Sequence, residues 1–252
     1  MALTEICRII RNERIAEGVF DMRLESLEIA ALASAGQFVH VACPGYTLRR
    51  PISVCSAGEG ELRLVYEVRG RGTAALSKLL PGDTADILGP LGRGYPELSG
   101  HILAVGGGIG APPMLGLAAS ADLASAVLGF RNAGKAILIP EFESICARLE
   151  VATDDGSLGY KGTVLPAAEK ILSEENISAV CACGPKIMLK NLAALCAEKK
   201  VPLYVSLEER MGCGVGACLV CSVKIKTADG WKYERVCRDG PVFAAEEVCW
   251  DE

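Results

Sequence analysis

Basic residues are in deficit in this sequence. Lys and Arg together number 26 against 31 Asp and Glu, so the formal net charge at pH 7 is -5. Proteins that bind the phosphate backbone of nucleic acids usually carry an excess of positive charge on one face, where it displaces counterions. We therefore expect no nucleic acid among the partners of this chain.

Long uncharged apolar runs are also missing. Residues 1–14 mix apolar and charged side chains, and Asp122 interrupts the most apolar later stretch, residues 115–130. A signal peptide or a membrane-spanning helix requires an apolar segment without such charges. We expect a cytoplasmic protein that makes no membrane contact of its own.

Cysteine, in contrast, is abundant, with 12 residues. A disulfide framework is not expected without an export signal, because cytosolic thiol pools keep cysteines reduced. Most of the cysteines are dispersed over the first 200 residues, where a free cysteine commonly acts as a small buried apolar side chain. Four others lie close together between positions 213 and 237, which indicates metal or cluster ligation. The last, Cys249, is predicted not to be a ligand.

The chain has 252 residues, 50% of them hydrophobic, which is enough for two or three small domains. Residues 1–97 contain short β-rich runs separated by Gly and Pro, which predicts an antiparallel β-barrel. In residues 98–206, strands, glycine-rich turns and apolar helices alternate, which predicts a Rossmann-like parallel α/β domain that binds a nucleotide. Residues 207–252 hold the clustered cysteines and are too few for a core of their own.

Local patterns place individual elements. In the first domain one helix is predicted at residues 74–80, capped by Thr73 and ended by Pro81. The elements predicted in the second domain are helices at residues 114–120, 164–174 and 186–199, and strands at residues 102–105, 126–130, 136–140, 149–153, 179–182 and 203–206. A small sheet is predicted around residues 222–226.

The clustered cysteines follow the spacing C-x4-C-x2-C, with a fourth cysteine further along; they are Cys213, Cys218, Cys221 and Cys237. The first three match the run of plant-type ferredoxins, in which a tight loop brings thiolates to two irons. Glycines between them allow the backbone dihedrals that such a loop needs. Zinc also takes four thiolates, but zinc sites usually present two short pairs, and this segment has one C-x-x-C. The spacing therefore favours a 2Fe-2S cluster, with zinc as the alternative.

Two candidate anion-binding patterns lie in the barrel domain. The run RPIS, which is Arg50, Pro51, Ile52 and Ser53, begins with a guanidinium fork that can hold a pyrophosphate. The run RGRGT contains Gly72 and Thr73 and opens the predicted helix, so its backbone N–H groups can face an anion. Each run also has an ordinary structural interpretation, as a strand segment or a capped glycine turn. From the residues alone, a flavin site here is one hypothesis beside those.

Two further patterns predict a nicotinamide site. In GGGIGAPP, glycines between a strand and a helix let a pyrophosphate approach the helix start; they are Gly106, Gly107, Gly108 and Gly110. A later strand ends in Cys183, Gly184 and Pro185, at the edge where open α/β sheets bind ligands. Cys183 is either a residue over the nicotinamide ring or a small buried side chain. Glu141 and Asp154 are the candidate acids for the ribose.

The order RPIS, GRGT, GGGIG, CGP and cysteine loop resembles the ferredoxin-reductase superfamily with an added C-terminal cluster domain. More narrowly, the chain is similar to the electron-transfer subunits of NAD-dependent dihydroorotate dehydrogenase. The runs SLEERMGCGVGACLVC and VCRDGPVF carry the most specific part of a likeness that covers nearly the whole chain. The resemblance implies a six-stranded FAD-binding barrel, an NAD-binding α/β domain and a small domain with a 2Fe-2S cluster.

The resemblance also implies site residues. The family's flavin-binding positions fall on residues 50–53, on Val65, Tyr66 and Glu67, and on Gly72 with Thr73, and its cluster ligands fall on the four clustered cysteines. Glu67 is a departure, because the family often has a basic residue there. We expect a catalytic role for Cys183 beside the nicotinamide.

The implied function is electron transfer. FAD can exchange a hydride with a nicotinamide and single electrons with a cluster, so it stands between them. The resemblance implies electrons passing from dihydroorotate through the FMN of a catalytic subunit, the cluster and FAD to NAD+, in a heterotetramer with two copies of each subunit. NAD rather than NADP rests mainly on the resemblance. The alternatives are a reductase subunit of a hydrogenase, sulfide dehydrogenase or ferredoxin-dependent transhydrogenase, and a zinc-stabilised adaptor.

Overall fold

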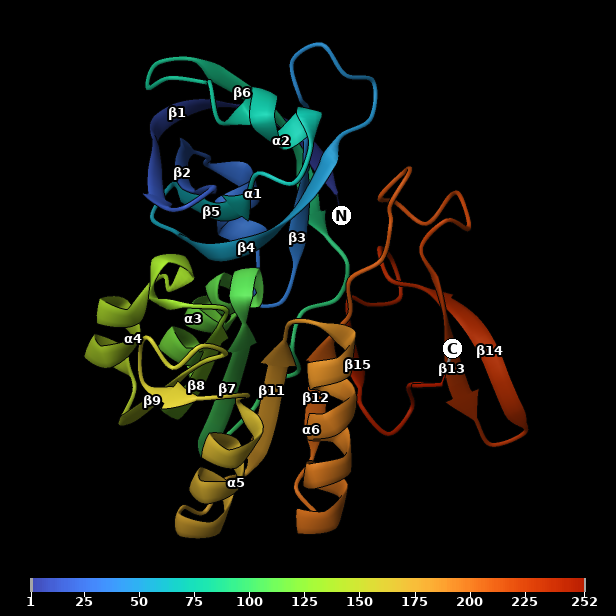
Figure 1. Ribbon diagram of the computed structural model, residues 1–252. Coiled ribbons are helices and arrows are strands. Elements are labelled where there is room, and N and C mark those ends of the chain that lie inside the picture. The colour runs from blue at the N-terminus through green and yellow to red at the C-terminus, as the bar shows by residue number, and fades with distance from the viewer. Residues whose placement is uncertain (1, 252) are drawn as a thin grey trace.

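The computed structural model describes residues 2–251 and consists of three parts (Figure 1). A β-barrel, drawn in blue and cyan, lies above a sheet flanked by helices, drawn in green to orange. A red hairpin lies beside that sheet, towards the C-terminal end of the chain. Within the described residues, no helix has both the length and the apolar character needed to span a bilayer.

The barrel is a closed ring of six antiparallel strands in the order β1-β2-β5-β4-β3-β6. Side chains along β6 alternate between buried and more exposed, as expected when one face of a strand lines a core. The core is apolar and includes Ile9, Leu24, Leu62 and Ile87. These strands confirm the predicted barrel. Its elements are β1 (Leu3–Ala16), β2 (Val19–Glu25), α1 (Glu28–Leu32), β3 (Phe38–Val41), β4 (Arg50–Gly58), β5 (Glu61–Glu67), α2 (Arg71–Leu76) and β6 (Thr84–Leu91).

Helix α2 differs from the helix predicted in this domain. The prediction of residues 74–80 with Thr73 as the cap was wrong, because α2 spans Arg71–Leu76. The Thr73 hydroxyl accepts a hydrogen bond from the backbone N–H of Gly70 at 3.2 Å, so it closes the first turn from inside the helix. After the helix, the Asp83 carboxylate accepts a backbone N–H at 2.8 Å and holds the chain in a turn.

The second part is a seven-stranded sheet in the order β10-β9-β8-β7-β11-β12-β15, parallel except for β15. Alternate residues of β7 face opposite helix layers. Ile102 and Ala104 pack with α3 and α4, whereas Leu103 and Val105 pack with α5 and α6, which confirms the predicted α/β domain. Its elements are β7 (His101–Gly107), α3 (Ala111–Ser120), β8 (Leu123–Phe130), α4 (Ile139–Ile145), β9 (Arg148–Thr153), β10 (Tyr160–Lys161), α5 (Leu165–Glu174), β11 (Ala179–Cys183), α6 (Lys186–Lys199), β12 (Leu203–Ser206) and β15 (Val242–Ala244), with 3-10 turns at Gly108–Gly110 and Ala133–Lys135.

The predicted strand at residues 136–140 was wrong. This stretch follows a 3-10 turn and runs into α4. Leu138 has a φ of 61°, a left-handed conformation that ends an extended run. Pro140 lies in the first turn of α4, where its missing N–H costs no hydrogen bond. The other strands and helices predicted in this domain are present, some with shifted ends.

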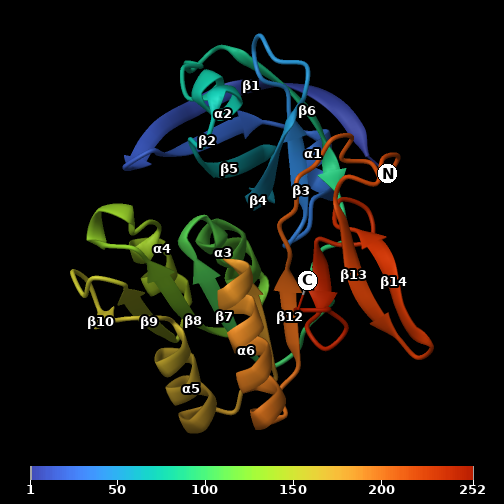
Figure 2. The ribbon, with the colours of Figure 1, turned by 45° about the vertical axis from the view of Figure 1, so that its right-hand side comes forward.

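The third part is the hairpin of β13 (Ser222–Thr227) and β14 (Gly230–Arg235), together with the loop before it, residues 207–221. Ile225 and Val236 pack into the same apolar cluster as one face of the α/β sheet. Strand β15 then pairs with β12 at the edge of that sheet. The segment therefore shares the core of its neighbour. Figure 2 shows the orange loop rising from β12 towards the end of the barrel.

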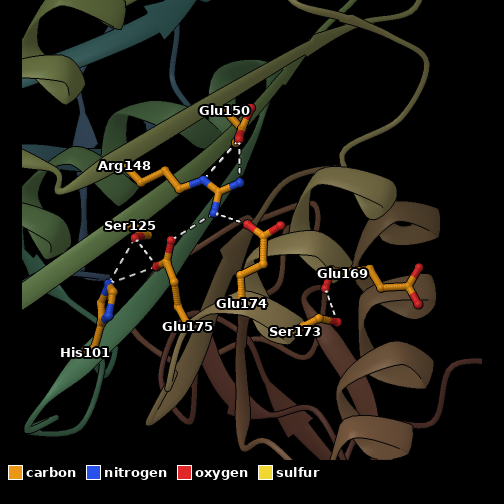
Figure 3. Close-up of polar contacts among 8 residues, drawn as sticks. All are labelled: His101, Ser125, Arg148, Glu150, Glu169, Ser173, Glu174 and Glu175. Atoms are coloured by element: carbon orange, nitrogen blue, oxygen red, sulfur yellow. Dashed lines mark hydrogen bonds and ion pairs between the residues drawn. The ribbon is translucent and has the colours of Figure 1, made fainter.

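A polar network closes the amino-terminal edge of the sheet (Figure 3). The His101 ring at the start of β7 lies 2.9 Å from the Ser125 hydroxyl, which donates to the Glu175 carboxylate at 2.7 Å. Arg148, the first residue of β9, pairs with Glu175 and with two further glutamates. Because Ser125 is buried, the network satisfies a polar group inside the sheet. Ligands of open α/β sheets bind at the opposite, carboxyl edge.

Candidate electron-transfer site

Strand pairing brings two of the four clustered cysteines together. Cys221 lies directly before β13, and Cys237 lies just after β14. The N–H of Val236 donates to the Cys221 carbonyl at 2.9 Å, so these two cysteines meet at the open end of the hairpin. Cys213 and Cys218 come from the loop that precedes the hairpin.

The four thiols form two close pairs. The Cys218 N–H donates to the Cys213 sulfur at 3.3 Å, so these two residues lie side by side in the loop. Cys221 and Cys237 form the second pair. Within residues 2–251, no three His, Cys, Asp or Glu side chains gather as the ligands of one metal ion would. Two pairs fit a cluster of two irons in which each iron takes two thiolates.

The cysteine loop also stabilises negative charge on sulfur. Burial raises the pKa of Cys213, but the backbone N–H groups of Cys218, Val215 and Ala217 outweigh it and lower the pKa to about 6. The loop turns through Gly214, whose φ of +72° would strain a larger residue. Backbone donors around sulfur are what an anionic iron-sulfur centre requires, so the residues present fit such a group.

The two predicted flavin motifs meet on the barrel. Arg50 begins β4, and its guanidinium lies against Gly72 in α2, where an added Cβ would be 2.5 Å from Arg50 Nε. A larger residue at position 72 would displace the guanidinium. Arg50 Nη1 also donates to the Leu48 carbonyl at 2.6 Å, and the guanidinium lies over the Tyr46 ring. The structure therefore places a positioned cation beside the turn predicted to bind an anion.

The other predicted flavin residues differ in what they offer a ligand. Residues 51–53 continue β4 and pair with β3. Val65 and Tyr66 on β5 are buried, and the Tyr66 hydroxyl donates to an asparagine at 3.0 Å. Glu67, the acidic residue that departs from the family pattern, accepts a hydrogen bond from Arg69 Nε at 2.9 Å. Its carboxylate is therefore engaged in an ion pair within the chain. On β5 the backbone is therefore the part that can face a flavin.

The two predicted nicotinamide motifs meet at the carboxyl edge of the sheet. Strands β7 and β11 are parallel neighbours, and Gly106 pairs with Cys183 at their ends. An added Cβ at Gly110 would lie 2.1 Å from the Cys183 carbonyl oxygen, and one at Gly107 would lie 2.8 Å from Pro185. Glycine is required for these close approaches.

The Cys183 thiol is neutral. Burial raises its pKa to about 12, which the Ser206 hydroxyl opposes and the Glu208 carboxylate reinforces. The turns on either side bend through Gly108 and Gly184, both at positive φ. This edge therefore presents a small uncharged side chain and glycine backbone.

The two candidate acids for the ribose have different surroundings. Glu141 in α4 accepts a hydrogen bond from Arg63 at 3.1 Å, and Arg63 also binds the buried Asp21 through two bonds of 3.0 Å. Glu141 thus belongs to an ion-pair cluster between α4 and the barrel. Asp154 follows β9 at the carboxyl edge, where nucleotides bind in such sheets.

A cavity of about 840 Å³ lies where the three parts of the chain meet. Its lining includes Arg50 and Pro51 from the barrel, Gly184 and Pro185 from the sheet edge, and Glu208 from the cysteine loop segment. Pockets for cofactors are of this size. A second cavity, of about 470 Å³, surrounds the ion-pair cluster and contains none of the RPIS, glycine or cysteine motif residues. The larger cavity is therefore the candidate site.

Two contributions to this region were not predicted from the sequence. Arg69 bridges Glu67 on the barrel and Glu208 at 3.1 Å, which ties the barrel to the start of the cysteine loop. His40 on β3 is 1% exposed and lies against Gly214 in that loop. Both contacts join residues far apart in the sequence. Arg69 is the first residue of the RGRGT run, but no local pattern indicates its contact with Glu208, and His40 belongs to no motif.

Comparison with known proteins identifies the family. Residues 208–249 match the model of the iron-sulfur cluster binding domain of dihydroorotate dehydrogenase B. Two relatives, from Caldanaerobacter subterraneus subsp. tengcongensis and Desulforamulus reducens, are each 42% identical and are named dihydroorotate dehydrogenase B (NAD(+)), electron transfer subunit. The alignments cover 96% of both chains in the first case and 97% of both in the second. The chain belongs to this family.

The dihydroorotate dehydrogenase B electron transfer subunit family shares its fold with solved reductases. The structure of an NADH-dependent reduced ferredoxin-NADP oxidoreductase matches with a TM-score of 0.86 and 36% identity, over 98% of this chain and 91% of that one. An Amycolatopsis cytochrome P450 reductase matches with a TM-score of 0.66 and 20% identity, over 79% of this chain and 67% of that one, which shows the fold alone. Both the predicted family and the predicted fold class are confirmed.

Proposed function

We propose that the chain is the electron-transfer subunit of an NAD-dependent dihydroorotate dehydrogenase in pyrimidine biosynthesis. Electrons pass from the FMN of a catalytic subunit through a 2Fe-2S cluster and FAD to NAD+. The observation that carries this function is the meeting of the RPIS strand, the CGP turn and the cysteine loop segment around one cavity. Relatives that align over nearly their whole length carry the name of this subunit.

Each part of the chain serves one carrier. We assign residues 1–97 to FAD, residues 98–206 to NAD and residues 207–252 to the cluster. When bound, FAD exchanges a hydride with the nicotinamide and single electrons with the cluster. Arg50 and the backbone at Gly72 hold the flavin pyrophosphate, while the glycine turn after β7 admits that of the nicotinamide. The four clustered cysteines hold the irons.

Cys183 is the residue that we place beside the nicotinamide ring. It ends β11 at the carboxyl edge, where Gly110 lies against its carbonyl oxygen. Its raised pKa keeps the thiol uncharged near pH 7. A small neutral side chain leaves room for the ring and adds no charge that would oppose hydride movement.

The cysteine loop presents apolar side chains to solvent. Val215, Leu219 and Val220 are 46%, 75% and 59% exposed, and they lie among the ligand cysteines. Exposed apolar residues that adjoin one another commonly mark a face covered by another protein. We place the FMN-containing catalytic subunit on this face, in a cytoplasmic heterotetramer of two copies of each subunit.

Reconstitution tests this function. Dihydroorotate and NAD+ are mixed anaerobically with the FMN subunit of the same organism, with and without this chain, and NADH is followed by absorbance. We expect NADH only when both proteins are present. If the chain contains flavin and iron, oxidises NADH with artificial acceptors and never couples to dihydroorotate, the partner assignment is wrong.

A reductase subunit of a ferredoxin-dependent transhydrogenase is the second candidate. The 36% identity to the NADH-dependent reduced ferredoxin-NADP oxidoreductase structure favours it, but the curated dihydroorotate dehydrogenase relatives are closer, at 42%. Supplying NADH, reduced ferredoxin and NADP+ in place of dihydroorotate and NAD+ distinguishes the two. Only a transhydrogenase complex would then oxidise one NADH and two reduced ferredoxins, take up one proton and form two NADPH.

A further inference from the structure

The His40 side chain has a buried nitrogen without a hydrogen-bond partner among the described residues. It lies on β3, is 1% exposed, and its ring makes an edge contact with Phe38, with ring centroids 5.8 Å apart. Among the described residues, His40 Nε2 is buried and has no hydrogen-bond partner. A buried donor or acceptor left unpaired costs stability, so such a group calls for a ligand or a functional reason.

The polar edge of the ring faces the cysteine loop. A Cβ added at Gly214 would lie 2.5 Å from His40 Cε1, 2.7 Å from Nδ1 and 2.8 Å from Nε2. The N–C–N edge of the imidazole therefore occupies the place of a side chain at position 214. Gly214 directly follows Cys213, so the ring meets the loop between the first two ligand cysteines.

The same residue adjoins the flavin motif. Strand β3 pairs with β4, and His40 is opposite Pro51 of the RPIS run. One side chain thus connects the wall of the barrel that carries the flavin motif with the loop that carries the cysteines. Figure 1 shows β3 on the side of the barrel that faces the orange and red segments.

The surroundings keep the imidazole neutral. Burial, which is the larger cause, and the nearby Arg49 guanidinium together lower the pKa of His40 to about 4. That guanidinium donates to the carbonyl of His40 at 3.4 Å and is paired with Asp86 at 2.7 Å. A neutral imidazole has one N–H and one acceptor nitrogen, so it can donate one hydrogen bond to sulfur.

We propose that His40 is a positioning residue for the cluster, whose ring N–H donates a hydrogen bond to a sulfur held in the cysteine loop. This inference rests on the proposed function, because it requires an iron-sulfur centre in that loop. Hydrogen bonds to sulfur stabilise the extra negative charge of the reduced state, so they make the centre easier to reduce. The ring also fixes the loop against the flavin-bearing wall of the barrel.

The reduction equilibrium of the cluster in two variants of the full-length holoprotein tests the proposal. His40→Leu keeps a similar volume without a donor, whereas His40→Gln retains an N–H near the position of Nε2. In an anaerobic redox titration followed by EPR, we expect His40→Leu to shift the equilibrium towards the oxidised cluster by roughly three- to tenfold, and tenfold corresponds to about 59 mV for one electron. His40→Gln should restore most of the wild-type equilibrium. An unchanged potential in His40→Leu, or an equal shift in both variants, would overturn the proposal.

A second measurement uses the wild-type chain, so it does not depend on how the His40 variants fold. The chain has only two histidines, so 15N-histidine labelling marks His40 and His101 alone. Pulsed EPR of the reduced wild-type cluster should detect a weak 15N coupling, and His101→Asn should retain it because His101 lies in the network at the amino-terminal edge of the sheet. Absence of the coupling would contradict the proposal. A chain that contains zinc and no reducible cluster would instead refute the proposed function itself.

Discussion

Gly110→Ala should impair the nicotinamide site and leave the other two sites intact. The new Cβ would lie 2.1 Å from the Cys183 carbonyl oxygen, which is backbone and cannot turn away. The end of β11 or the turn after β7 must therefore move by about 1 Å, and a misplacement of that size can lower a rate about hundredfold. Overpacking of this kind also costs about 1–3 kcal/mol of stability. Stopped-flow reduction of the bound flavin by NADH measures the first effect, and urea unfolding measures the second.

Gly100→Ala is the matched control for this variant. Gly100 has a φ of +81°, and an added Cβ would lie 2.6 Å from Ser178 Oγ, at the amino-terminal edge of the sheet. We expect a loss of stability with little change in flavin reduction by NADH, and normal flavin and iron contents in both variants. If Gly110→Ala reduces its flavin at the wild-type rate, or if Gly100→Ala slows equally, the nicotinamide does not bind at the carboxyl edge as proposed.

Three further predictions follow from particular contacts. Arg63→Met removes both hydrogen bonds to the buried Asp21 and leaves it only the Arg23 guanidinium at 4.0 Å, so it should cost about 3 kcal/mol in urea unfolding; a loss below 1 kcal/mol would contradict the importance of this pair. Glu5 accepts hydrogen bonds from Ser26 and from the first N–H groups of α1, which outweigh burial and hold its pKa below the usual 4.5. The stability that Glu5 contributes is therefore fully present above pH 4.5 and is lost as the pH falls through its lowered pKa. Glu5→Gln should lower the free energy of unfolding by about 1 kcal/mol at pH 7 and by progressively less below pH 4.5 in the same assay. A cost independent of pH would refute that account. Leu219→Asp should weaken copurification with the FMN subunit at least tenfold without affecting flavin reduction by NADH, whereas Leu123→Asp, also at an exposed position but on the α/β sheet, should not; equal binding by both variants would place the partner elsewhere.

Motif chemistry made much of the site predictable. The cysteine spacing, the RPIS run and the glycine turns each require particular residue types at fixed separations, so they could be recognised in the sequence. The structure brings Arg50 against Gly72 and Gly110 against Cys183, so motifs that are separate in the sequence meet in space. Short β-rich runs separated by Gly and Pro predicted the barrel, and the succession of strands, glycine-rich turns and apolar helices predicted the α/β domain.

Local backbone conformation and long-range contacts explain which elements and contacts the sequence did not reveal. The run at residues 136–140 is apolar like a strand, but the left-handed backbone of Leu138 and the proline that follows direct it into a helix. Strand β15 has only three residues and exists through its pairing with β12, so no local periodicity could reveal it. The contact of His40 with the cysteine loop depends on how the barrel and the loop pack, and one histidine within an apolar strand carries no pattern.

Anaerobic titration with NADH, followed by absorbance and EPR together, tests the central claim most directly. In the wild-type chain, NADH should bleach the flavin and then produce the EPR spectrum of a reduced 2Fe-2S cluster. Cys249→Ser, which alters a cysteine outside the ligand set, should behave as the wild type does. Cys221→Ser should lose the EPR spectrum and all transfer to the FMN subunit while flavin bleaching continues. Transfer that persists in Cys221→Ser, or zinc in place of iron in the wild-type chain, would contradict the account.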